Sequence, residues 1–286
     1  MRQNRCMNIK HQLGRTHLVL DSPHSGVDYP ADFKHSADLV ALRRAEDTHV
    51  DKLYDFAPAL GVGWVEALFP RSYLDANRHP SEIDVSMIDG VWTGPVATNG
   101  VFLNKIKIGK GLIWRTTDDN APIYQRQLSV AEVQARLQHC WQPYHDAVAQ
   151  TIDAAHTRHG YNIHVNCHSM PAFASSEGMG QPGEAYADFV IGDRDGTTAN
   201  PALSRLVCQH LEGCGYSVSY NYPYKGVELV RCYSNPAEHR HSIQVEINRK
   251  LYMNEDTREL IPNAMVLKTH LRSLVDLLLA TDPSAL

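Results

Sequence analysis

The sequence predicts an α/β protein in which helices cover both faces of a mixed sheet, giving three layers. Segments of strand-like apolar pattern alternate along the chain with longer segments of helical apolar spacing. The 286 residues are 43% hydrophobic and 21% charged, which is typical of a soluble globular protein. Since no repeat or low-complexity tract divides the sequence, we expect a single domain over residues 1–286.

The first third of the chain predicts strand, helix and strand in turn. Residues 16–20 read as an apolar strand that runs into a turn rich in Pro, Ser and Gly. Residues 36–61 have helical apolar spacing, with Ser36 as the expected N-cap and Gly61 at the far end. Residues 61–69 then read as a second strand.

The middle of the chain is harder to assign. Residues 84–120 are rich in Gly, Thr and Asp, so we expect loops and a hairpin there. Residues 129–160 predict one long helix or a helix pair, which Pro143 kinks or breaks. The next strand is expected at 162–167, and the elements that follow it are a strand (186–193), a helix with a strand (200–221), a strand (241–249) and a helix (259–281).

Charge and hydropathy exclude some classes of partner. The formal net charge is −5 and the sequence contains no basic stripe with interleaved aromatic residues, which argues against a nucleic-acid binder. No run of about eighteen apolar residues predicts a membrane span, and the N-terminal residues do not resemble a secretory signal. We therefore expect a cytoplasmic protein with a small-molecule substrate. The sequence leaves its oligomeric state open.

Two histidines follow two predicted strands. His24 comes just after the first strand and His168 just after the central strand. Ligands of open α/β sheets bind at the carboxyl ends of the strands. Imidazole is a good ligand for zinc, so the pair predicts a zinc site, although another divalent metal remains possible. The alternative is that each histidine only bonds a nearby turn carbonyl.

A catalytic zinc site takes a third protein ligand and a base. The stretch Arg-Arg-Ala-Glu-Asp-Thr-His-Val-Asp offers Glu46, Asp47, His49 and Asp51, although spacing alone favours a solvated, charged helix face as the explanation of this stretch. Glu246 is the candidate base because a carboxylate inside an apolar strand is unfavourable without a function or a partner. The alternative is an edge strand that leaves Glu246 in water.

Arginines are the candidate substrate-binding residues, because a guanidinium binds a carboxylate through two parallel hydrogen bonds. Arg71 and Arg78 lie in a polar loop after the second strand, while Arg231 and Arg249 flank the late strand. Surface salt bridges are the ordinary alternative. A cysteine amidase that pairs Cys167 with the following histidine is disfavoured, because adjacent strand residues point to opposite faces.

Nine segments, in order from about Leu18 to Glu255, resemble the N-formylglutamate amidohydrolase family. The resemblance is most specific in NCHSMP and QVEINRKLYMNE. The other segments are DSPHSGVDYP, EDTHVDKLY, DANRHP, GLIWR, WQPYHDA, DFVIGDRDG and NYPYKG. The resemblance implies a cytosolic metal-dependent amidase with a fold related to zinc carboxypeptidases and aspartoacylases. The implied reaction converts N-formyl-L-glutamate and water to L-glutamate and formate, a step of histidine degradation.

The resemblance also implies a role for each site residue. His24, Asp47 and His168 fall on the metal-ligand positions and Glu246 on the catalytic glutamate. Arg71 is expected to polarise the formyl oxygen. The residues that the resemblance implies for the substrate carboxylate are Asn77 and Arg78. We also expect Arg249 to bind the substrate, because it lies near the late strand.

The chain departs from the family pattern at two positions. Asn166 replaces the aspartate that usually precedes Cys-His-Ser, and Val227 replaces a glycine. An asparagine oxygen can still accept a hydrogen bond from a ligating histidine, but without the charge. Both departures concern the substrate more than the metal chemistry. The alternative functions are hydrolysis of another N-acyl amino acid or a short peptide, and non-catalytic binding of an amino acid or a metal.

Overall fold

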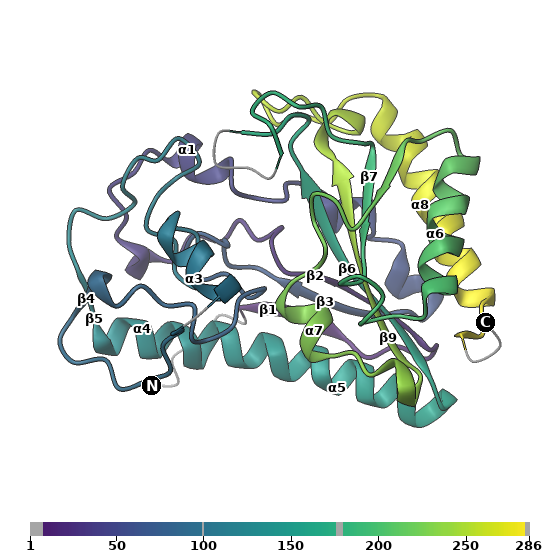
Figure 1. Ribbon diagram of the computed structural model, residues 1–286, viewed down its shortest axis with the longest axis horizontal. Helices are drawn as coiled ribbons and strands as arrows, with labels where there is room; N and C mark the ends of the chain where they lie inside the picture. The colour runs from purple at the N-terminus through teal and green to yellow at the C-terminus, as the bar shows by residue number, and fades with distance from the viewer. Residues whose placement is uncertain (1–7, 99, 176–179, 284–286) are drawn as a thin grey trace. The chain divides into compact units, whose positions relative to one another are not determined.

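The computed structural model describes residues 8–98, 100–175 and 180–283 (Figure 1). Seven strands form one sheet in the order β1-β3-β2-β6-β9-β7-β8, and β4 and β5 form a separate pair. The strands are β1 (Ile9–Gln12), β2 (Leu18–Ser22), β3 (Gly63–Ala67), β4 (Ile88–Asp89), β5 (Leu128–Ser129), β6 (Asn162–Met170), β7 (Phe189–Gly192), β8 (Val218–Tyr220) and β9 (Arg240–Asn248). The helices are α1 (Leu39–Arg43), α2 (Val50–Leu53), α3 (Gly100–Lys107), α4 (Val130–Arg136), α5 (Gln142–His159), α6 (Pro201–Gly213), α7 (Glu228–Cys232) and α8 (Asn263–Ala280).

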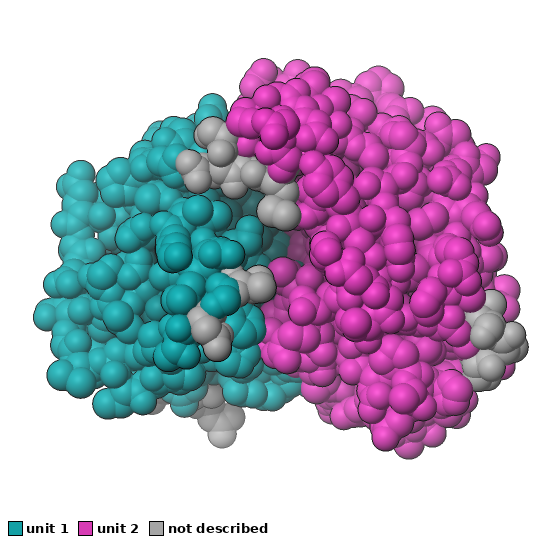
Figure 2. Space-filling model, viewed as in Figure 1, with its two compact units in different colours: residues 1–11, 23–46, 65–147 teal, residues 12–22, 47–64, 148–286 magenta. Residues whose placement is uncertain are grey.

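The described chain divides into two compact units, which Figure 2 colours separately. Unit 1 comprises residues up to 11, 23–46 and 65–147, and unit 2 comprises residues 12–22, 47–64 and those from 148 onward. The chain passes between the units several times, so neither unit is a continuous segment. A single amidohydrolase domain over the whole chain stays a prediction.

The sheet of unit 2 is mixed, as the sequence predicts. β6 runs parallel to β2 on one side and to β9 on the other, whereas β9 runs antiparallel to β7. Alternation along β6 points Ile163, Val165 and Cys167 into the apolar core, which also contains side chains of α2, α6 and α8. The opposite face of β6 carries the polar side chains, including His168.

The segment 36–61 is not one helix. It contains α1, α2 and a 3₁₀ turn at Ala57–Leu60, and Asp38 rather than Ser36 caps α1. Asp47 lies in the turn between α1 and α2, and His49 adopts a left-handed conformation with φ 68°. Asp and Thr compete with the helix for backbone hydrogen bonds, which explains why the Glu-Asp-Thr-His stretch interrupts the apolar spacing.

The helices and strands predicted for the middle of the chain are only partly confirmed. Residues 129–160 form α4, a π-helical turn at Leu137–Trp141 and α5, with Pro143 in the first turn of α5. The expected hairpin in 84–120 is wrong, because β4 pairs in parallel with β5 and the segment contains the unpredicted helix α3. The central strand extends to Met170, so His168 stands inside β6 rather than after it.

The mixed α/β sheet with flanking helices is thus confirmed. Of the helices in the described residues, none is long and apolar enough to cross a membrane.

Candidate metal and catalytic site

Strand β6 presents His168 on its polar face, buried with 3% of its surface exposed. Its Nδ1 lies 2.9 Å from Oδ2 of Asp47, and its Nε2 lies 2.7 Å from Oδ1 of Asn166. The side-chain amide of Asn166 donates to Asp21 over 2.8 Å. Since a carboxylate oxygen accepts, the amide nitrogen of Asn166 must face Asp21 and its oxygen must face His168.

Asp47 is held from its other side by Arg249. Nη2 of Arg249 donates to Oδ1 of Asp47 over 3.2 Å, and its Nε donates to Oγ of Ser169 over 3.1 Å. Arg249 follows β9 directly, so the strand fixes the guanidinium that orients this carboxylate. The sequence predicts Arg249 as a substrate-binding residue. The structure places it on Asp47, and its contact with substrate stays a prediction.

In unit 1, His24 and Arg71 share a buried carboxylate. Nε2 of His24 lies 2.7 Å from Oδ1 of Asp75, and Nη2 of Arg71 donates to Oδ2 of Asp75 over 3.0 Å. The backbone N–H of Asn77 also donates to Oδ1, over 2.9 Å. Burial opposes ionisation of Asp75, but His24, Arg71 and Arg78 hold the pKa of its carboxyl well below the usual range.

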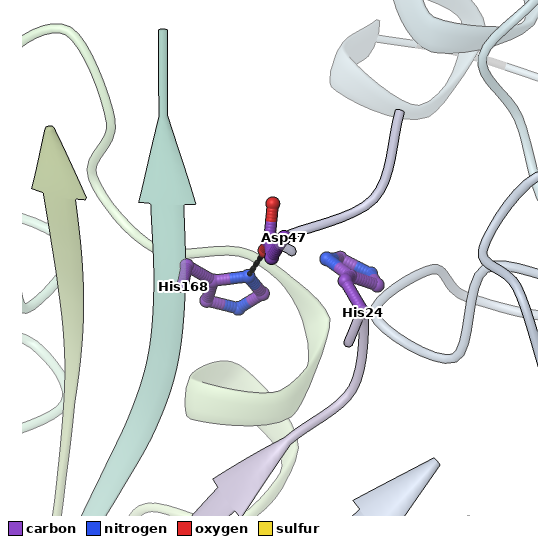
Figure 3. Close-up of side chains that lie close together, drawn as sticks. All are labelled: His24, Asp47 and His168. Carbon is purple, nitrogen blue, oxygen red and sulfur yellow. Dashed lines mark hydrogen bonds and ion pairs between the residues drawn. The ribbon is translucent and has the colours of Figure 1, made fainter. Parts of the chain in front are cut away.

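One group of three among the described residues could hold a metal ion. It consists of His24, Asp47 and His168, all buried, and their potential ligand atoms lie within 4.8 Å of one another. The three side chains point toward one another, and the Asp47–His168 contact is drawn between them (Figure 3). The structure thus brings together the three predicted ligands. Glu46 and Asp51, the other acidic candidates, are not in this group.

The hydrogen bonds around both histidines fit a metal ion. Asn166 and Asp75 accept from Nε2 of His168 and His24, so a neutral ring keeps its lone pair on Nδ1. The Nδ1 lone pair of His168 then faces a carboxylate oxygen of Asp47. The contact between these two atoms is favourable when a cation lies between them, either a proton on the imidazole ring or a metal ion. Ligating histidines usually donate their second N–H to an oxygen in this way.

Glu246 stands beside His168 on the neighbouring strand. The two residues are paired in the parallel register of β6 and β9, and Glu246 is buried with 7% of its surface exposed. Nε2 of Gln244 donates to Oε1 of Glu246 over 2.8 Å. Because β9 pairs with strands on both sides, the alternative of a solvated edge strand is wrong. Gln244 was not singled out from the sequence, although its i−2 spacing places it on the same face.

Arg78 lies in unit 1 with its guanidinium buried. Its Nε donates to the carbonyl of Lys110 over 3.2 Å, its Nη1 donates to the carbonyl of Asn77 over 3.1 Å, and Glu82 lies 3.8 Å from Nε. The surface salt bridge that the sequence allows is therefore excluded for Arg78. Arg231, in contrast, forms a two-point ion pair with Glu228 on α7, which is the ordinary alternative.

Lys105 on α3 is a residue that the sequence does not indicate. Partial burial and the like charges of Arg78 and Arg71 lower the pKa of its ammonium to about 8, against the opposing effects of Asp75 and Glu82. Within the described part of the chain no carboxylate forms an ion pair with Lys105. It therefore adds a cation to the group formed by Arg71 and Arg78.

Cys167 does not have the properties of a nucleophile. Its side chain is fully buried in the apolar core, on the face of β6 opposite His168. Burial raises the pKa of its thiol well above the usual value, and the nearby Asp21 raises it further. The cysteine-amidase alternative is therefore wrong.

A mixed sheet that presents a buried His-Asp-His group beside a buried glutamate has the components of an amide hydrolase. The comparison with known proteins agrees with this class. The model of the N-formylglutamate amidohydrolase family matches residues 16–253, and the chain belongs to that family. The predicted family is thus confirmed.

Three relatives illustrate the similarity. The chain is 42% identical to the crystallised N-formylglutamate amidohydrolase from Ralstonia eutropha JMP134, with a TM-score of 0.90 over 96% of this chain and 98% of that one. It is 29% identical to N-formylglutamate deformylase from Pseudomonas putida, over 92% of this chain and 93% of the relative. N-formylglutamate deformylase from Pseudomonas aeruginosa is 30% identical to the chain, over 85% of this chain and 84% of the relative. These names describe hydrolases of a linear amide.

Proposed function

We propose that the protein is a zinc-dependent N-formylglutamate deformylase. It hydrolyses the formamide bond of N-formyl-L-glutamate and releases L-glutamate and formate. The observation that carries the proposal is the group of His24, Asp47 and His168 with Glu246 on the strand next to His168. Membership of the amidohydrolase family supports the choice of substrate.

The metal ligands in this proposal are His24 and His168, each through Nδ1, and the carboxylate of Asp47. Zinc bound there supplies an activated water and a Lewis acid next to the formyl group. The hydrogen bonds from both Nε2 groups support this ligand set, because they leave both Nδ1 lone pairs available. Arg249 orients Asp47 by its contact with Oδ1, which leaves Oδ2 for the metal.

Glu246 is the proposed proton carrier. Its carboxylate takes a proton from the attacking water as the C–O bond forms, and returns it to the amide nitrogen as the C–N bond breaks. The amide of Gln244 supports this role, because the hydrogen bond to Oε1 fixes one oxygen of Glu246. The other carboxylate oxygen, Oε2, then exchanges the proton.

Cationic residues of unit 1 are the proposed substrate-binding groups. Arg71 polarises the formyl oxygen, while Asn77 and Arg78 bind a glutamate carboxylate. The burial of Arg78 and its backbone contacts support this role, because they hold the guanidinium in one orientation. Lys105 is the proposed partner of the second carboxylate, that of the side chain, since the substrate carries two carboxylates and the group has three cations. Arg249 contacts substrate from the Asp47 side.

This assignment also defines the proposed setting of the enzyme. The whole chain acts as one amidohydrolase domain in the cytoplasm, at the end of a histidine-degradation route, with a fold related to zinc carboxypeptidases and aspartoacylases.

The test is formate release from three substrates that differ at one position: N-formyl-L-glutamate, N-formyl-L-glutamine and N-formyl-L-norvaline. We expect the first to be hydrolysed with the highest kcat/KM, because only its side chain carries a carboxylate. Comparable rates for all three would leave an amidohydrolase but contradict the glutamate specificity. No formate from any of them, with or without added zinc, would refute the proposed function.

A further inference from the structure

A chain of buried hydrogen bonds extends from His168 into the centre of the sheet. Nε2 of His168 contacts Oδ1 of Asn166, and the amide nitrogen of Asn166 contacts Oδ1 of Asp21. The same oxygen of Asp21 lies 2.9 Å from Nε2 of His164. Asp21, His164 and Asn166 are each 0% exposed. These hydrogen bonds connect two neighbouring strands, because Asp21 and Asn166 are paired in the register of β2 and β6.

A carboxylate at this depth is unfavourable unless donors compensate it. Asp21 receives two N–H donors on one oxygen, from His164 and Asn166, which is the pattern that stabilises an ionised carboxylate. The negative charge of Asp21 therefore dictates the orientation of the Asn166 amide. An amide alone has no such preference, because its two ends occupy nearly the same space.

We propose that Asp21 is a positioning residue of the metal site, which acts on His168 through Asn166. The inference rests on the proposed function, because the ligand that Asp21 orients is one of the three assigned there. Asp21 holds the Asn166 oxygen toward His168, and that oxygen keeps the proton of His168 on Nε2. The Nδ1 lone pair is thereby directed to the metal, and Asn166 transmits part of the negative charge that a directly bonded aspartate would supply.

The first variant is Asp21→Asn. With an amide at position 21, Asn166 can turn its own amide nitrogen toward His168, whose Nε2 must then accept. The proton moves to Nδ1 and blocks the ligand position. We expect the zinc dissociation constant, measured by competition with a chelating dye, to rise about 10-fold.

The decisive variant exchanges the charge: Asp21→Asn together with Asn166→Asp. The amide nitrogen now at position 21 takes the place of the shared oxygen and donates both to the new carboxylate and to Nε2 of His164, whose proton moves to Nδ1 and faces Oγ of Ser242. The carboxylate at position 166 accepts from Nε2 of His168. The direction of the hydrogen bond from His168 is thereby preserved. We expect zinc affinity to return to within about 3-fold of wild type, since the ligand tautomer is restored. A merely structural role for Asp21 gives no reason for this recovery.

The matched control is Asp193→Asn. Asp193 is another fully buried aspartate of unit 2, with donors from Ser204, Tyr220 and Asn221, and it is not one of the described residues that could hold the metal. The substitution is expected to lower the Tm of the zinc-free protein without changing zinc affinity. If the Asp21 variant does not fold, Asn166→Ala is compared with the charge-exchange variant instead, and is expected to bind zinc about 10- to 100-fold more weakly.

The outcomes separate the inference from the function it rests on. Wild-type zinc affinity in the Asp21→Asn variant, or a charge-exchange variant as weak as the single one, overturns the role of Asp21 while the deformylase assignment stands. Wild-type protein that binds no zinc overturns the metal site and the inference together. Formate release is measured in parallel, and neither conclusion depends on it.

Discussion

The two histidines of the candidate metal site are oriented by different means. His24 donates directly to the carboxylate of Asp75, which Arg71 also contacts, on a loop of unit 1. His168 stands on a strand of unit 2 and donates to a neutral amide, with the carboxylate of Asp21 one residue further away. In a neutral ring, both arrangements place the proton on Nε2. The histidine on the regular strand is thus oriented through an intermediate residue, whereas the histidine on the loop is oriented by direct contact with a carboxylate.

The substitution with the largest expected effect is at Glu246, which takes part in neither of these two hydrogen-bond arrangements. Replacement by Gln keeps the size of the side chain but removes the base, so kcat should fall about 1000-fold. Neither histidine is touched, and the zinc dissociation constant should stay at its wild-type value. Turnover and zinc content of the same preparation check this. Loss of zinc from the variant would mean that Glu246 is a ligand and not the base.

The second-largest effect is expected on zinc affinity, when the carboxylate that orients His24 is replaced. Asp75→Asn removes the carboxylate from His24, and Arg71 loses its partner as well. We expect zinc affinity to fall about 10- to 100-fold, and further than in the Asp21→Asn variant, because the charge acts without an intermediate residue. The control is Asp84→Asn, which removes another ion-paired carboxylate of unit 1. A smaller loss for Asp75 than for Asp21 would contradict the comparison.

The residues of the candidate site can be predicted from the sequence to different degrees. His168 and Glu246 could be found because an imidazole and a carboxylate interrupt apolar strands, which is a local signal. His24 follows the same logic at the end of β2. Asp75 and Asp21 lie within the family motifs but were not assigned a role, because that role depends on partners that are 51 and 145 residues away along the chain.

Errors in the predicted elements have a related cause. The apolar spacing of 36–61 indicated one helix, but the left-handed His49 and the turn at Asp47 separate α1 from α2. No sequence pattern identified α3, so Lys105 could not be placed near Arg71 and Arg78. Local periodicity indicates regular elements well. It does not indicate turns that are fixed by long-range hydrogen bonds.

A smaller effect concerns substrate binding and its pH dependence. The pKa of Lys105 is about 8, so the ammonium is charged below that pH and neutral above it. Burial is the main cause of this lowered pKa, and the charged groups that act on the ammonium are Arg78, Arg71, Asp75 and Glu82. KM for N-formyl-L-glutamate should therefore rise as the pH increases through about 8, while a bound carboxylate shifts the transition upward.

Two variants test that assignment. Lys105→Met should raise KM for N-formyl-L-glutamate about 10-fold, since one charge-assisted contact is lost, and leave KM for N-formyl-L-glutamine unchanged. The variant Lys105→Arg should keep KM low and abolish the rise in KM above a pH of about 8. An equal rise of KM for both substrates in the Met variant would show that Lys105 does not bind the side-chain carboxylate.

The smallest effect is expected at Cys167, the residue next to His168. Its thiol is buried on the opposite face of β6, so Cys167→Ala should keep kcat/KM within about 3-fold, because no nucleophile is lost. The small cavity should lower the free energy of unfolding by about 1 kcal/mol. A loss of turnover as large as that of the Glu246 variant would revive a thiol mechanism.

In the proposed mechanism, both histidines and Asp47 bind one catalytic zinc ion. The most direct measurement is a titration of zinc into chelator-stripped protein, with formate release from N-formyl-L-glutamate recorded at each step. We predict that activity rises in proportion to bound zinc and stops rising at one zinc ion per chain. Full activity in the stripped protein, or zinc binding without any formate release, would contradict a zinc-dependent deformylase.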